Sequence, residues 1–362
     1  MDMDLQYVNE MNKSISGLFK RALKITVGEP SKAAFLIRTI GEQRRAAGLR
    51  MNWEDRGIHV PAFMITSITK RCNLRCKGCY AMAQNRDLEE EMQIEKLADI
   101  YAEAGKLGIS IILIAGGEPL ARPEIVDVAG SFPHIIFPLF TNGMLIDDGI
   151  SSKLKKYKNI VPVISIEGLE ENTDARRGSG VAKTLREVFS RLSRDRIFWG
   201  VSFTVTEMNH DTVTGDALIK DLIAMGCKLF FFVEYIPVKE GTEPMVVSVE
   251  HREGLLRRLD VLRKQYNSLF IAFPGDEQKF GGCLSSGRGF IHISPGGNVE
   301  PCPFAPYSDA SLANRTLKEA LQSKFLLKIR QNYRELSEGE GGCALWEKRD
   351  WVRALLGIET TR

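Results

Sequence analysis

Three cysteines stand close together in the stretch RCNLRCKGCY at residues 71–80. Cys72, Cys76 and Cys79 have the spacing C-x3-C-x2-C, and basic residues lie between and beside them. Neighbouring cations lower the pKa of a thiol and favour the thiolate, which is the form that binds metals. A closed zinc site needs a fourth Cys or His, and the nearest histidine in sequence is His59. An iron–sulfur cluster with three protein ligands instead keeps one iron open for an added ligand.

A second group of cysteines lies towards the C-terminus and comprises Cys283, Cys302 and Cys343. Thirteen residues separate Cys283 from Gly297, and four more separate Gly297 from Cys302. Six of the seven cysteines fall in these two groups, and grouped cysteines favour metal ligation over disulfides in a reducing compartment. The same three thiols together with His292 would also make a zinc site, so this alternative stays open.

The remaining cysteine and three histidines receive no role in chemistry. Cys227 stands apart from both groups and precedes the apolar run LFFFV, which predicts a buried packing residue. His134, His210 and His251 fall in predicted helices or in loops away from the expected site.

Composition excludes several classes of protein. With 44% hydrophobic and 26% charged residues and a net charge of +3, the chain has neither the bias of a disordered protein nor a basic tail, so no nucleic-acid partner is expected. The N-terminus carries acidic residues and no signal-peptide pattern, and the apolar runs fall far short of the ~20 residues that cross a bilayer. We expect a cytoplasmic protein of roughly two domains, or one barrel with additions.

From residue 63 onward, short apolar segments alternate with longer helical patterns. The apolar segments predict six buried strands, at residues 63–68, 109–115, 135–140, 161–166, 198–205 and 229–236. Helices are predicted between them, near residues 91–107, 121–130, 148–157, 181–194 and 211–225. This alternation predicts an α/β fold in which a parallel sheet with right-handed crossovers curves into a partial (β/α)6 TIM-like barrel.

The flanking segments predict additions at both ends of the barrel. A helix (250–267) and a strand (269–273) follow the sixth unit, and Pro295-Gly296-Gly297 then predicts a β-hairpin. Two closing helices are predicted at residues 317–332 and 344–356. We therefore divide the chain into an N-terminal helical extension (1–60), the partial barrel (61–274) and a small C-terminal domain (275–362).

The N-terminal extension is basic and contains an amphipathic pattern. Its first 50 residues hold nine Lys or Arg against five Asp or Glu, and Ile15, Leu18, Phe19 and Ala22 fall at helical spacing. One interpretation is a capping helix packed on the barrel. The alternative is contact with a membrane surface, where each basic residue near anionic headgroups adds about 1 kcal/mol.

Residues with chemical potential follow the predicted strands at one edge of the sheet. They are Cys72, Cys76 and Cys79 after the first strand, Gly116, Gly117, Glu118 and Pro119 after the second, Thr141 and Asn142 after the third, Ser165 and Glu167 at the fourth, and Glu234 and Tyr235 at the sixth. Because parallel α/β folds bind ligands at the C-terminal ends of their strands, we expect these residues to share one site.

The run ITKRCNLRCKGCY, placed after a first strand with GGEP after the second, resembles the signature of the radical SAM superfamily. The resemblance implies a 4Fe-4S cluster held by the first three cysteines, with S-adenosylmethionine (SAM) bound to its fourth iron. GGEP resembles the segment that meets the methionine amino group, with Glu118 as the acceptor for this cation. One position departs from the pattern: Gly78 stands where an aromatic residue is usual, and Tyr80 follows, which weakens the expectation for adenine packing.

Other residues match the superfamily one at a time. Thr141 and Asn142 match positions that contact the ribose or methionine part of SAM. Ser165 and Glu167, in VISIEG, resemble the polar pair on the fourth strand, and Arg177, in ARRGSG, resembles a basic residue that pairs with the SAM carboxylate.

The resemblance implies reductive cleavage of SAM to a 5'-deoxyadenosyl radical, which removes a hydrogen atom from the substrate. The protein would position the reactants and exclude water while the cofactors carry the chemistry. An electron donor such as flavodoxin or ferredoxin and an anaerobic setting are implied as well. Glu234 and Tyr235 are candidates for contact with SAM or substrate, with packing at the rim as the alternative.

The second cysteine group resembles the opening of SPASM and twitch extensions, which bind auxiliary iron–sulfur clusters. The later cysteines of a full SPASM domain are missing, so the resemblance implies one additional 4Fe-4S cluster on Cys283, Cys302 and Cys343. Its fourth iron would be open, or held by a non-cysteine residue or by substrate.

Relatives with this architecture often modify peptides or proteins, so a peptide is the expected substrate class. A small molecule or lipid is the alternative; a narrow buried pocket would favour a small molecule and a long apolar groove a lipid. A non-catalytic iron–sulfur electron carrier or zinc-stabilised binding module is the alternative from a different class.

Overall fold

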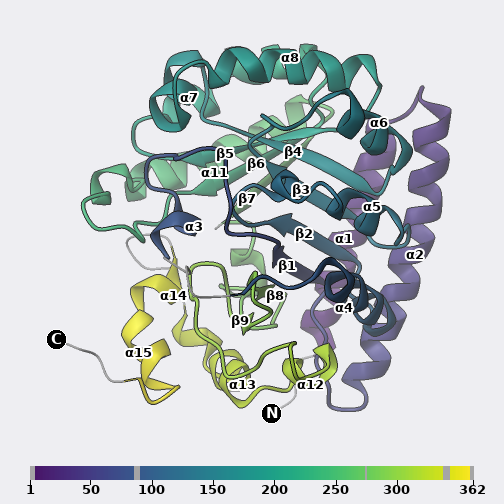
Figure 1. Ribbon diagram of the computed structural model, residues 1–362, viewed down its shortest axis with the longest axis vertical. Coiled ribbons are helices and arrows are strands. Elements are labelled where there is room, and N and C mark those ends of the chain that lie inside the picture. Colours follow the sequence, from purple (N-terminus) through teal and green to yellow (C-terminus); the bar gives the residue numbers. More distant parts are fainter. Residues whose placement is uncertain (1–4, 85–89, 274, 337–342, 359–362) are drawn as a thin grey trace.

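One curled sheet organises the molecule. The computed structural model describes residues 5–84, 90–273, 275–336 and 343–358, and its sheet has the order β7-β6-β5-β4-β3-β2-β1-β8-β9. The strands are β1 (Phe63–Ser67), β2 (Ile111–Ala115), β3 (Phe137–Thr141), β4 (Ile160–Ile166), β5 (Gly200–Val205), β6 (Leu229–Glu234), β7 (Leu269–Phe273), β8 (Phe290–Ile293) and β9 (Val299–Glu300). Neighbouring strands run parallel except β8 and β9, which are antiparallel. The predicted α/β partial barrel is confirmed (Figure 1).

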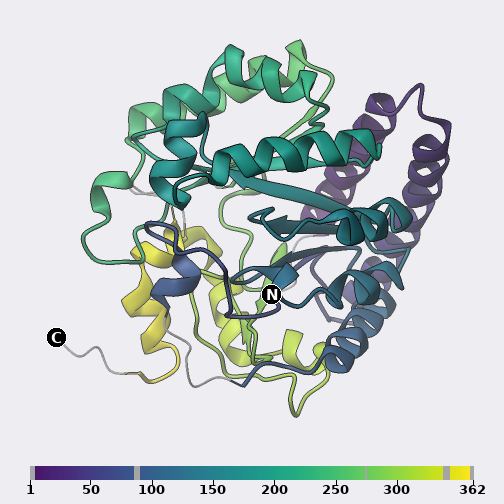
Figure 2. The same cartoon turned by 45° about the horizontal axis from the view of Figure 1, so that its top comes forward.

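Helices cover the outer face of this sheet (Figures 1 and 2). The covering helices are α4 (Ile94–Leu107), α5 (Ile125–Gly130), α6 (Asp148–Lys156), α7 (Glu170–Arg177), α8 (Val181–Arg194), α9 (His210–Thr214), α10 (Asp216–Ala224) and α11 (Val249–Gln265). The short helix α3 (Tyr80–Ala83) lies apart from them, directly after the first cysteine group. Helix α4 shows why they pack: Leu97, Ile100, Tyr101 and Ala104 recur at helical spacing and are buried. Gly108, at φ +98°, ends this helix in the left-handed conformation that glycine adopts without strain.

Side chains of the barrel strands alternate between two environments. On β1, Met64 is fully buried beneath the helices, whereas Phe63 and Ile65 line the barrel interior. The same alternation separates Phe232 from Phe231 on β6. Because successive side chains of a strand point to opposite faces, each strand contributes to an outer core and to an inner wall.

The sheet extends beyond the six predicted barrel strands. β7 pairs with β6, and β8 pairs with β1 in register Phe63↔Phe290. The predicted hairpin is therefore part of the barrel sheet, although it lies beyond the expected domain boundary at residue 274, which is outside the described residues. The remaining C-terminal helices are α12 (Leu317–Leu321), α13 (Lys324–Gln331), α14 (Ala344–Glu347) and α15 (Arg349–Ala354).

The N-terminal extension forms two helices, α1 (Leu5–Ile25) and α2 (Pro30–Glu54), which pack on one another at the N-terminal ends of the strands (Figure 1). The apolar face of α1, including Ile15 and Phe19, is buried in the same cluster as Ile111 and Leu229 at the starts of β2 and β6. This packing is what the capping-helix interpretation predicts. Among the described residues, no helix combines the length and the apolar character needed to cross a membrane.

Candidate active site

Three chain segments are joined around the first cysteine group. The amide of Gly117 donates to the carbonyl of Thr69 at 2.7 Å, and that of Glu118 donates to the carbonyl of Arg71 at 2.8 Å. On the other side, the amide of Lys77 donates to the carbonyl of Arg176 at the end of α7, at 2.9 Å. These bonds fix the cysteine loop against the segments that follow β2 and β4.

The close approach of the first two segments requires glycine. Gly116 has φ +134°, and a Cβ there would lie 2.6 Å from the carbonyl oxygen of Thr69. Only glycine adopts this backbone conformation and leaves room for the neighbouring loop. The GG of GGEP is therefore required by the backbone geometry, whatever its contact with a ligand.

Burial dominates the electrostatics of the cysteine loop. The pKa of Cys72 and that of Cys76 are both raised, primarily by desolvation, although Arg177 and Arg176 oppose the shift at Cys76. This differs from the expectation that cations within the loop lower the thiol pKa values, because those cations, such as Arg75, are exposed. Further contributions come from the other thiolates: Cys76 and Cys79 raise the pKa of Cys72, so the three sulfur atoms are electrostatic neighbours.

Glu118 has no exposed surface, and its carboxylate is occupied by protein donors. Oε1 accepts from Thr141 Oγ1 at 2.7 Å and from the amide of Leu120 at 2.9 Å, and Oε2 accepts from the amide of Asn142 at 2.7 Å. Burial raises the pKa of Glu118, and these hydrogen bonds oppose the shift. In this arrangement Glu118 holds the loop after β3 in place, and Asn142 Nδ2 lies 3.8 Å from Cys72 Sγ.

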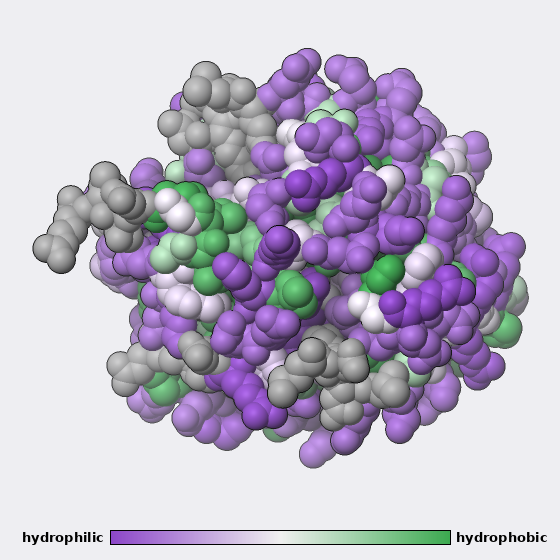
Figure 3. All heavy atoms as spheres, turned by 90° about the horizontal axis from the view of Figure 1, so that it is seen from below, coloured by the Kyte–Doolittle hydropathy of each residue, from purple (hydrophilic) through white to green (hydrophobic). Residues whose placement is uncertain are grey.

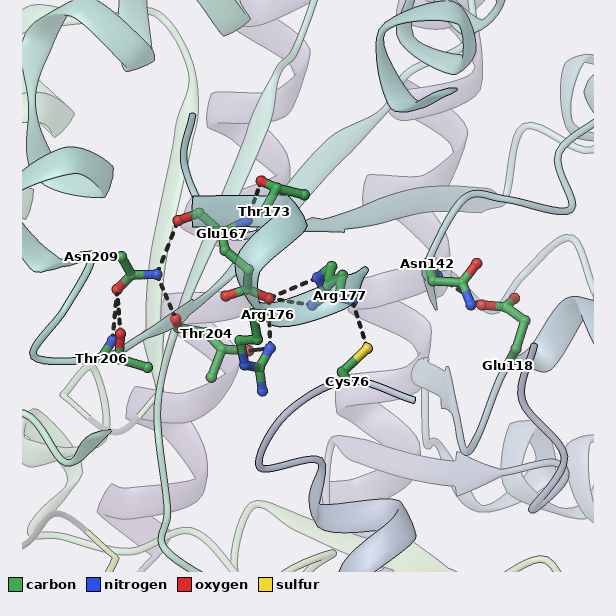
Figure 4. Close-up of polar contacts among 10 residues, drawn as sticks. All are labelled: Cys76, Glu118, Asn142, Glu167, Thr173, Arg176, Arg177, Thr204, Thr206 and Asn209. Atoms are coloured by element: carbon green, nitrogen blue, oxygen red, sulfur yellow. Dashed lines mark hydrogen bonds and ion pairs between the residues drawn. The ribbon is translucent and has the colours of Figure 1, made fainter. Parts of the chain in front are cut away.

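Two arginines converge on Glu167, as Figure 4 shows. Arg176 Nη1 and Arg177 Nε donate to Glu167 Oε1 at 2.6 and 2.7 Å. Arg177 Nη1 also lies 4.0 Å from Cys76 Sγ. Burial alone would lower the pKa of Arg177, but Glu167 and the Cys76 thiolate raise it, so the guanidinium stays charged. Sequence reasoning missed Arg176, and its position beside Arg177 in ARRGSG was the available signal.

The position before the third cysteine is glycine because Tyr235 fills the adjacent space. A Cβ on Gly78 would lie 2.5 Å from Tyr235 Oη and 2.9 Å from Cζ of the ring. Tyr235, at the end of β6, is buried, and its hydroxyl has no hydrogen-bond partner within the described part of the chain. The aromatic ring expected within the loop is thus supplied from another strand. Tyr80 packs edge-on against Phe304 instead, with ring centroids 5.1 Å apart.

Glu234 pairs with a residue that the sequence did not indicate. Its Oε2 accepts from Arg252 Nε at 2.7 Å, and both side chains are buried. Arg252 lies on α11, far from the other site residues in sequence, so no local pattern marked it. This ion pair fixes the end of β6 beside Tyr235.

The second cysteine group also gathers in space. The pKa of Cys302 is raised well above its usual value by burial and then by the nearby Cys343 and Cys283 thiolates. Burial and Glu277 raise the pKa of Cys283 to about 12. Glu277 is itself buried and was missed in sequence reasoning.

His292 does not join this cysteine group. Its Nδ1 lies 2.7 Å from Glu300 Oε2 and its Nε2 lies 2.8 Å from Ser67 Oγ, within the sheet. Both ring nitrogens are therefore engaged away from the thiols, and the zinc alternative lacks its expected fourth ligand.

The spread of the thiols is also informative. In the described segments, one Cys/His/Asp/Glu trio has its ligand atoms all within 4.8 Å of one another, and it is His210, Asp211 and His251. Neither cysteine trio is that compact. Thiolates on a single tetrahedral zinc ion at about 2.3 Å from the metal would be closer together than this, whereas a multi-iron cluster accepts a wider spread.

A single cavity of about 940 Å³ connects the two cysteine groups with the barrel interior. Of the predicted site residues, those that line it are Cys72, Cys76, Cys79, Tyr80, Gly116, Gly117, Thr141, Asn142, Ser165, Arg177, Glu234, Tyr235, Cys283, Cys302 and Cys343. Glu118, Pro119 and Glu167 are not among its lining residues and support it from behind. The expected gathering of these residues at one end of the strands is what the structure shows.

Cys227 behaves as the sequence predicted. It is fully buried in the main core, and burial raises its pKa to about 12. We expect Cys227→Ala to leave the iron content of the reconstituted protein unchanged, since this thiol lies outside both groups. Native protein at pH 8 should also resist alkylation at Cys227, as mass spectrometry of peptides would show; loss of iron in the variant would contradict this assignment.

Comparison with known proteins agrees with this geometry. Residues 66–214, from β1 to α9, match the model of the radical SAM superfamily. The chain is 25% identical to the AdoMet-dependent heme synthase of Methanosarcina barkeri over 80% of its own length and 89% of that protein. It is 32% identical to the mycofactocin maturase MftC of Mycolicibacterium smegmatis over 80% of its own length and 76% of that protein.

The fold is similar to that of a solved structure. Streptococcus suis SuiB bound to precursor peptide SuiA superposes with a TM-score of 0.62 at 16% identity, over 86% of this chain and 75% of that one, which is a likeness of fold alone. The cysteine loop, the family match and the extent of the MftC similarity lead to one conclusion: the chain belongs to the radical SAM superfamily.

Proposed function

We propose that this radical SAM enzyme binds its 4Fe-4S cluster through Cys72, Cys76 and Cys79 and removes a hydrogen atom from a substrate held in the barrel cavity. The observation that carries the proposal is that these three thiols line the same cavity as the segments after β2, β3 and β4. No disulfide joins any of the seven cysteines, so all three thiols are available as ligands. When bound, the cluster and SAM supply the reductive cleavage that produces a 5'-deoxyadenosyl radical.

The side chains around the cysteine loop are proposed to place a hydrogen-bond donor and a positive charge beside the thiolates. Asn142 Nδ2 and Arg177 Nη1 approach the sulfur atoms of Cys72 and Cys76, respectively. Donors and positive charge near ligating sulfurs raise the reduction potential of a cluster. Glu167 keeps the Arg177 guanidinium in this orientation, so we assign Glu167 a positioning role, together with the expected contact of Arg177 with the SAM carboxylate.

The glycine segment and the β3 loop would bind SAM. Gly116, Gly117, Thr141 and Asn142 line the cavity next to the cysteine loop. Glu118 orients Thr141 and Asn142 through its hydrogen bonds. The expected contact of Glu118 with the methionine amine is proposed as secondary, because its carboxylate oxygens already accept three hydrogen bonds.

Tyr235 and Glu234 are proposed to contact SAM or substrate. Both line the cavity, and Tyr235 Oη is buried without a hydrogen-bond partner among the described residues. A buried hydroxyl without a partner costs about 1–3 kcal/mol, so a bound ligand that accepts its hydrogen bond would recover this free energy.

The test of the proposed function is SAM cleavage by anaerobically reconstituted enzyme. With dithionite and SAM, we expect 5'-deoxyadenosine to accumulate, measured by liquid chromatography and mass spectrometry. A reduced, intact cluster that yields no 5'-deoxyadenosine would contradict the proposal and would favour the non-catalytic electron carrier. Against that carrier stands the cavity itself, since electron transfer alone needs no chamber for a second molecule.

The second cysteine group is proposed to hold an auxiliary 4Fe-4S cluster, for which the Glu277 carboxylate would serve as the non-cysteine ligand. The support is electrostatic proximity: the Glu277 carboxylate contributes to the raised pKa values of Cys283 and Cys302. The enzyme would then contain about eight irons per chain.

We expect Glu277→Gln to retain this iron content but to change the paramagnetic resonance spectrum of the auxiliary cluster. The neutral amide is nearly isosteric and is a weaker ligand for iron than a carboxylate, so the change isolates ligand charge. Glu243→Gln, at an exposed site at the start of the 3-10 helix Glu243–Met245, is the matched control. Identical spectra for Glu277→Gln and the unmodified enzyme would remove Glu277 from the site.

The electron donor would dock beside the first cysteine loop. Arg71, Arg75 and Lys77 are exposed there. A basic surface of this kind attracts an acidic redox protein such as flavodoxin or ferredoxin. Contact with a membrane surface is proposed only for the turn between α1 and α2, where Val27 is exposed, since the apolar face of α1 is covered.

The names of the relatives point to two substrate classes. MftC is a maturase and SuiB was solved with a precursor peptide, which supports the expected peptide substrate. The heme synthase supports a small molecule instead. The interior of the barrel offers a physical criterion for choosing between them.

A further inference from the structure

The cavity extends through the length of the barrel, beyond the residues proposed to bind SAM. At its upper end it is lined by Cys76 and Tyr235, and at its lower end by Ile111 and Leu229, which begin β2 and β6. Phe19 of α1 also lines it and lies beneath the starts of these strands. The floor of the chamber is therefore the N-terminal helix, and its roof is the cysteine loop.

The wall between roof and floor is mainly apolar, with Ser165, Ser202 and Thr204 on β4 and β5 as polar exceptions. Phe140 and Phe231 meet edge-on at 5.0 Å between ring centroids, and Phe231 stacks with Phe273 at 6.2 Å. Leu113 and Val161 also contribute to the wall. Closed barrels normally fill this space with side chains. Here it stays open, and its volume of about 940 Å³ is at the upper end of the roughly 300–1,000 Å³ of small-molecule sites.

A peptide fits this wall poorly. Each backbone amide or carbonyl that enters an apolar chamber without a partner costs about 1–3 kcal/mol. The apolar side chains of the wall offer no such partner, and the three hydroxyl groups on β4 and β5 are too few for an extended peptide. The face of the molecule seen in Figure 3 is mainly hydrophilic, with its apolar side chains gathered in a few groups. An apolar molecule therefore gains the most free energy by burying its surface inside the barrel.

The lower end of the cavity is basic. Lys155 and Lys158 precede β4, Arg196 precedes β5, and Arg21 lies on α1; all four line the cavity. Among the described residues, no salt bridge within 4.0 Å engages Arg21 or Arg196. Lys155 lies near enough to Asp195 for its charge to help lower the pKa of that carboxyl group. The acidic residues that line this end are fewer than the basic ones: Glu29 pairs with Lys32 at 2.6 Å. Asp195 accepts from Ser151 and faces Arg194 and Lys155.

We propose that the substrate is an anionic amphiphile, whose apolar body occupies the chamber between Phe140 and Phe273 and whose acidic head lies at Arg21, Lys155 and Arg196. This inference rests on the proposed function, because it places the apolar body beneath the site of hydrogen abstraction. Charge complementarity at the lower end and the apolar wall together select this occupant. A neutral lipid would leave the excess positive charge of the basic end unbalanced, and a polar metabolite would leave the apolar wall uncovered.

The test compares three probes by isothermal titration calorimetry with the anaerobically reconstituted enzyme. They are dodecyl phosphate, dodecyltrimethylammonium with the same chain and opposite charge, and inorganic phosphate, all below micellar concentrations. We expect dodecyl phosphate to bind at least about tenfold more tightly than the cationic probe. Inorganic phosphate should bind weakly, because it gains no apolar burial.

Two variants locate the bound probe. Lys155→Glu combined with Arg196→Glu should weaken dodecyl phosphate binding about tenfold or more. The control combines Lys183→Glu with Lys220→Glu, which is an equal charge change at exposed sites on α8 and α10. This control should bind dodecyl phosphate as tightly as the unmodified enzyme does. Leu113→Trp fills the chamber and should abolish binding. If Leu113→Trp does not fold, the Lys155→Glu, Arg196→Glu variant and its control still test the inference.

The outcomes separate this inference from the proposed function. Formation of 5'-deoxyadenosine by the unmodified enzyme and by the Lys183→Glu, Lys220→Glu control tests SAM cleavage alone. If both cleave SAM but dodecyl phosphate binds no better than the cationic probe, or binds equally to the Lys155→Glu, Arg196→Glu variant, the amphiphile inference is wrong while the proposed function stands. Absence of 5'-deoxyadenosine would instead overturn the proposed function.

Discussion

Alanine at Cys72, Cys76 or Cys79 is expected to abolish formation of 5'-deoxyadenosine and to lower iron content by about four per chain. The physical reason is that a three-ligand cluster has no spare protein thiolate: Cys227 is buried elsewhere, and the other three cysteines gather around Cys302. Iron assay and the SAM cleavage assay on reconstituted protein measure the two effects. Residual iron should remain at the second cysteine group.

The matched control for this prediction is Cys343→Ala, at the second group. We expect it to lose a similar amount of iron while still cleaving SAM, since its thiol belongs to the Cys283 and Cys302 set. A single-cysteine variant of the first group that retained SAM cleavage at the unmodified rate would show that the cluster is bound elsewhere.

Glu167→Ala is expected to lower the free energy of unfolding by about 3–5 kcal/mol, because it leaves two largely buried guanidinium groups without their counter-charge. Glu167 is 1% exposed and accepts from both Arg176 and Arg177 at 2.6 and 2.7 Å. Urea unfolding followed by circular dichroism measures the change. SAM affinity should fall as well, since Arg177 loses the bond that directs it towards Cys76.

Two comparisons make the Glu167 result specific. Glu170→Ala, on the exposed start of α7, should change stability by no more than about 0.5 kcal/mol. Glu167→Gln keeps the size of the side chain but removes its charge, so its loss of unfolding free energy should lie between those of Glu170→Ala and Glu167→Ala. Unchanged stability and unchanged SAM affinity in Glu167→Ala would mean that the arginines find equivalent partners and that Glu167 does not position them.

Much of the barrel was predictable because its information is local. Continuous β-branched and aromatic runs such as ISIILIA and LFFFVEYI identified β2 and β6, since strands buried on both faces need no polar alternation. The helix predicted at residues 211–225 is instead divided at Gly215 into α9 and α10. Local propensity predicted that this region is helical, but tertiary packing decided where the helix is interrupted.

The partners of the site residues were less predictable because they depend on side chains brought together by folding. Glu234 was a candidate from its place at the end of β6, but its partner Arg252 comes from α11. Glu277 lacks any motif and is recognised only because it lies beside Cys283 and Cys302. No spacing rule links such residues, since their separation in sequence is set by the length of the intervening elements.

The sequence by itself determined the spacing of the cysteines, the order of strands and helices, and the edge of the sheet at which the site lies, because each follows from residue type and local periodicity. Only the tertiary structure decided that Tyr235 covers Gly78, that β8 extends the barrel sheet beside β1, and that an apolar chamber remains open above α1. Those features arise from steric fit between distant segments, and burial then reversed the thiol pKa shift that the loop's own cations suggested.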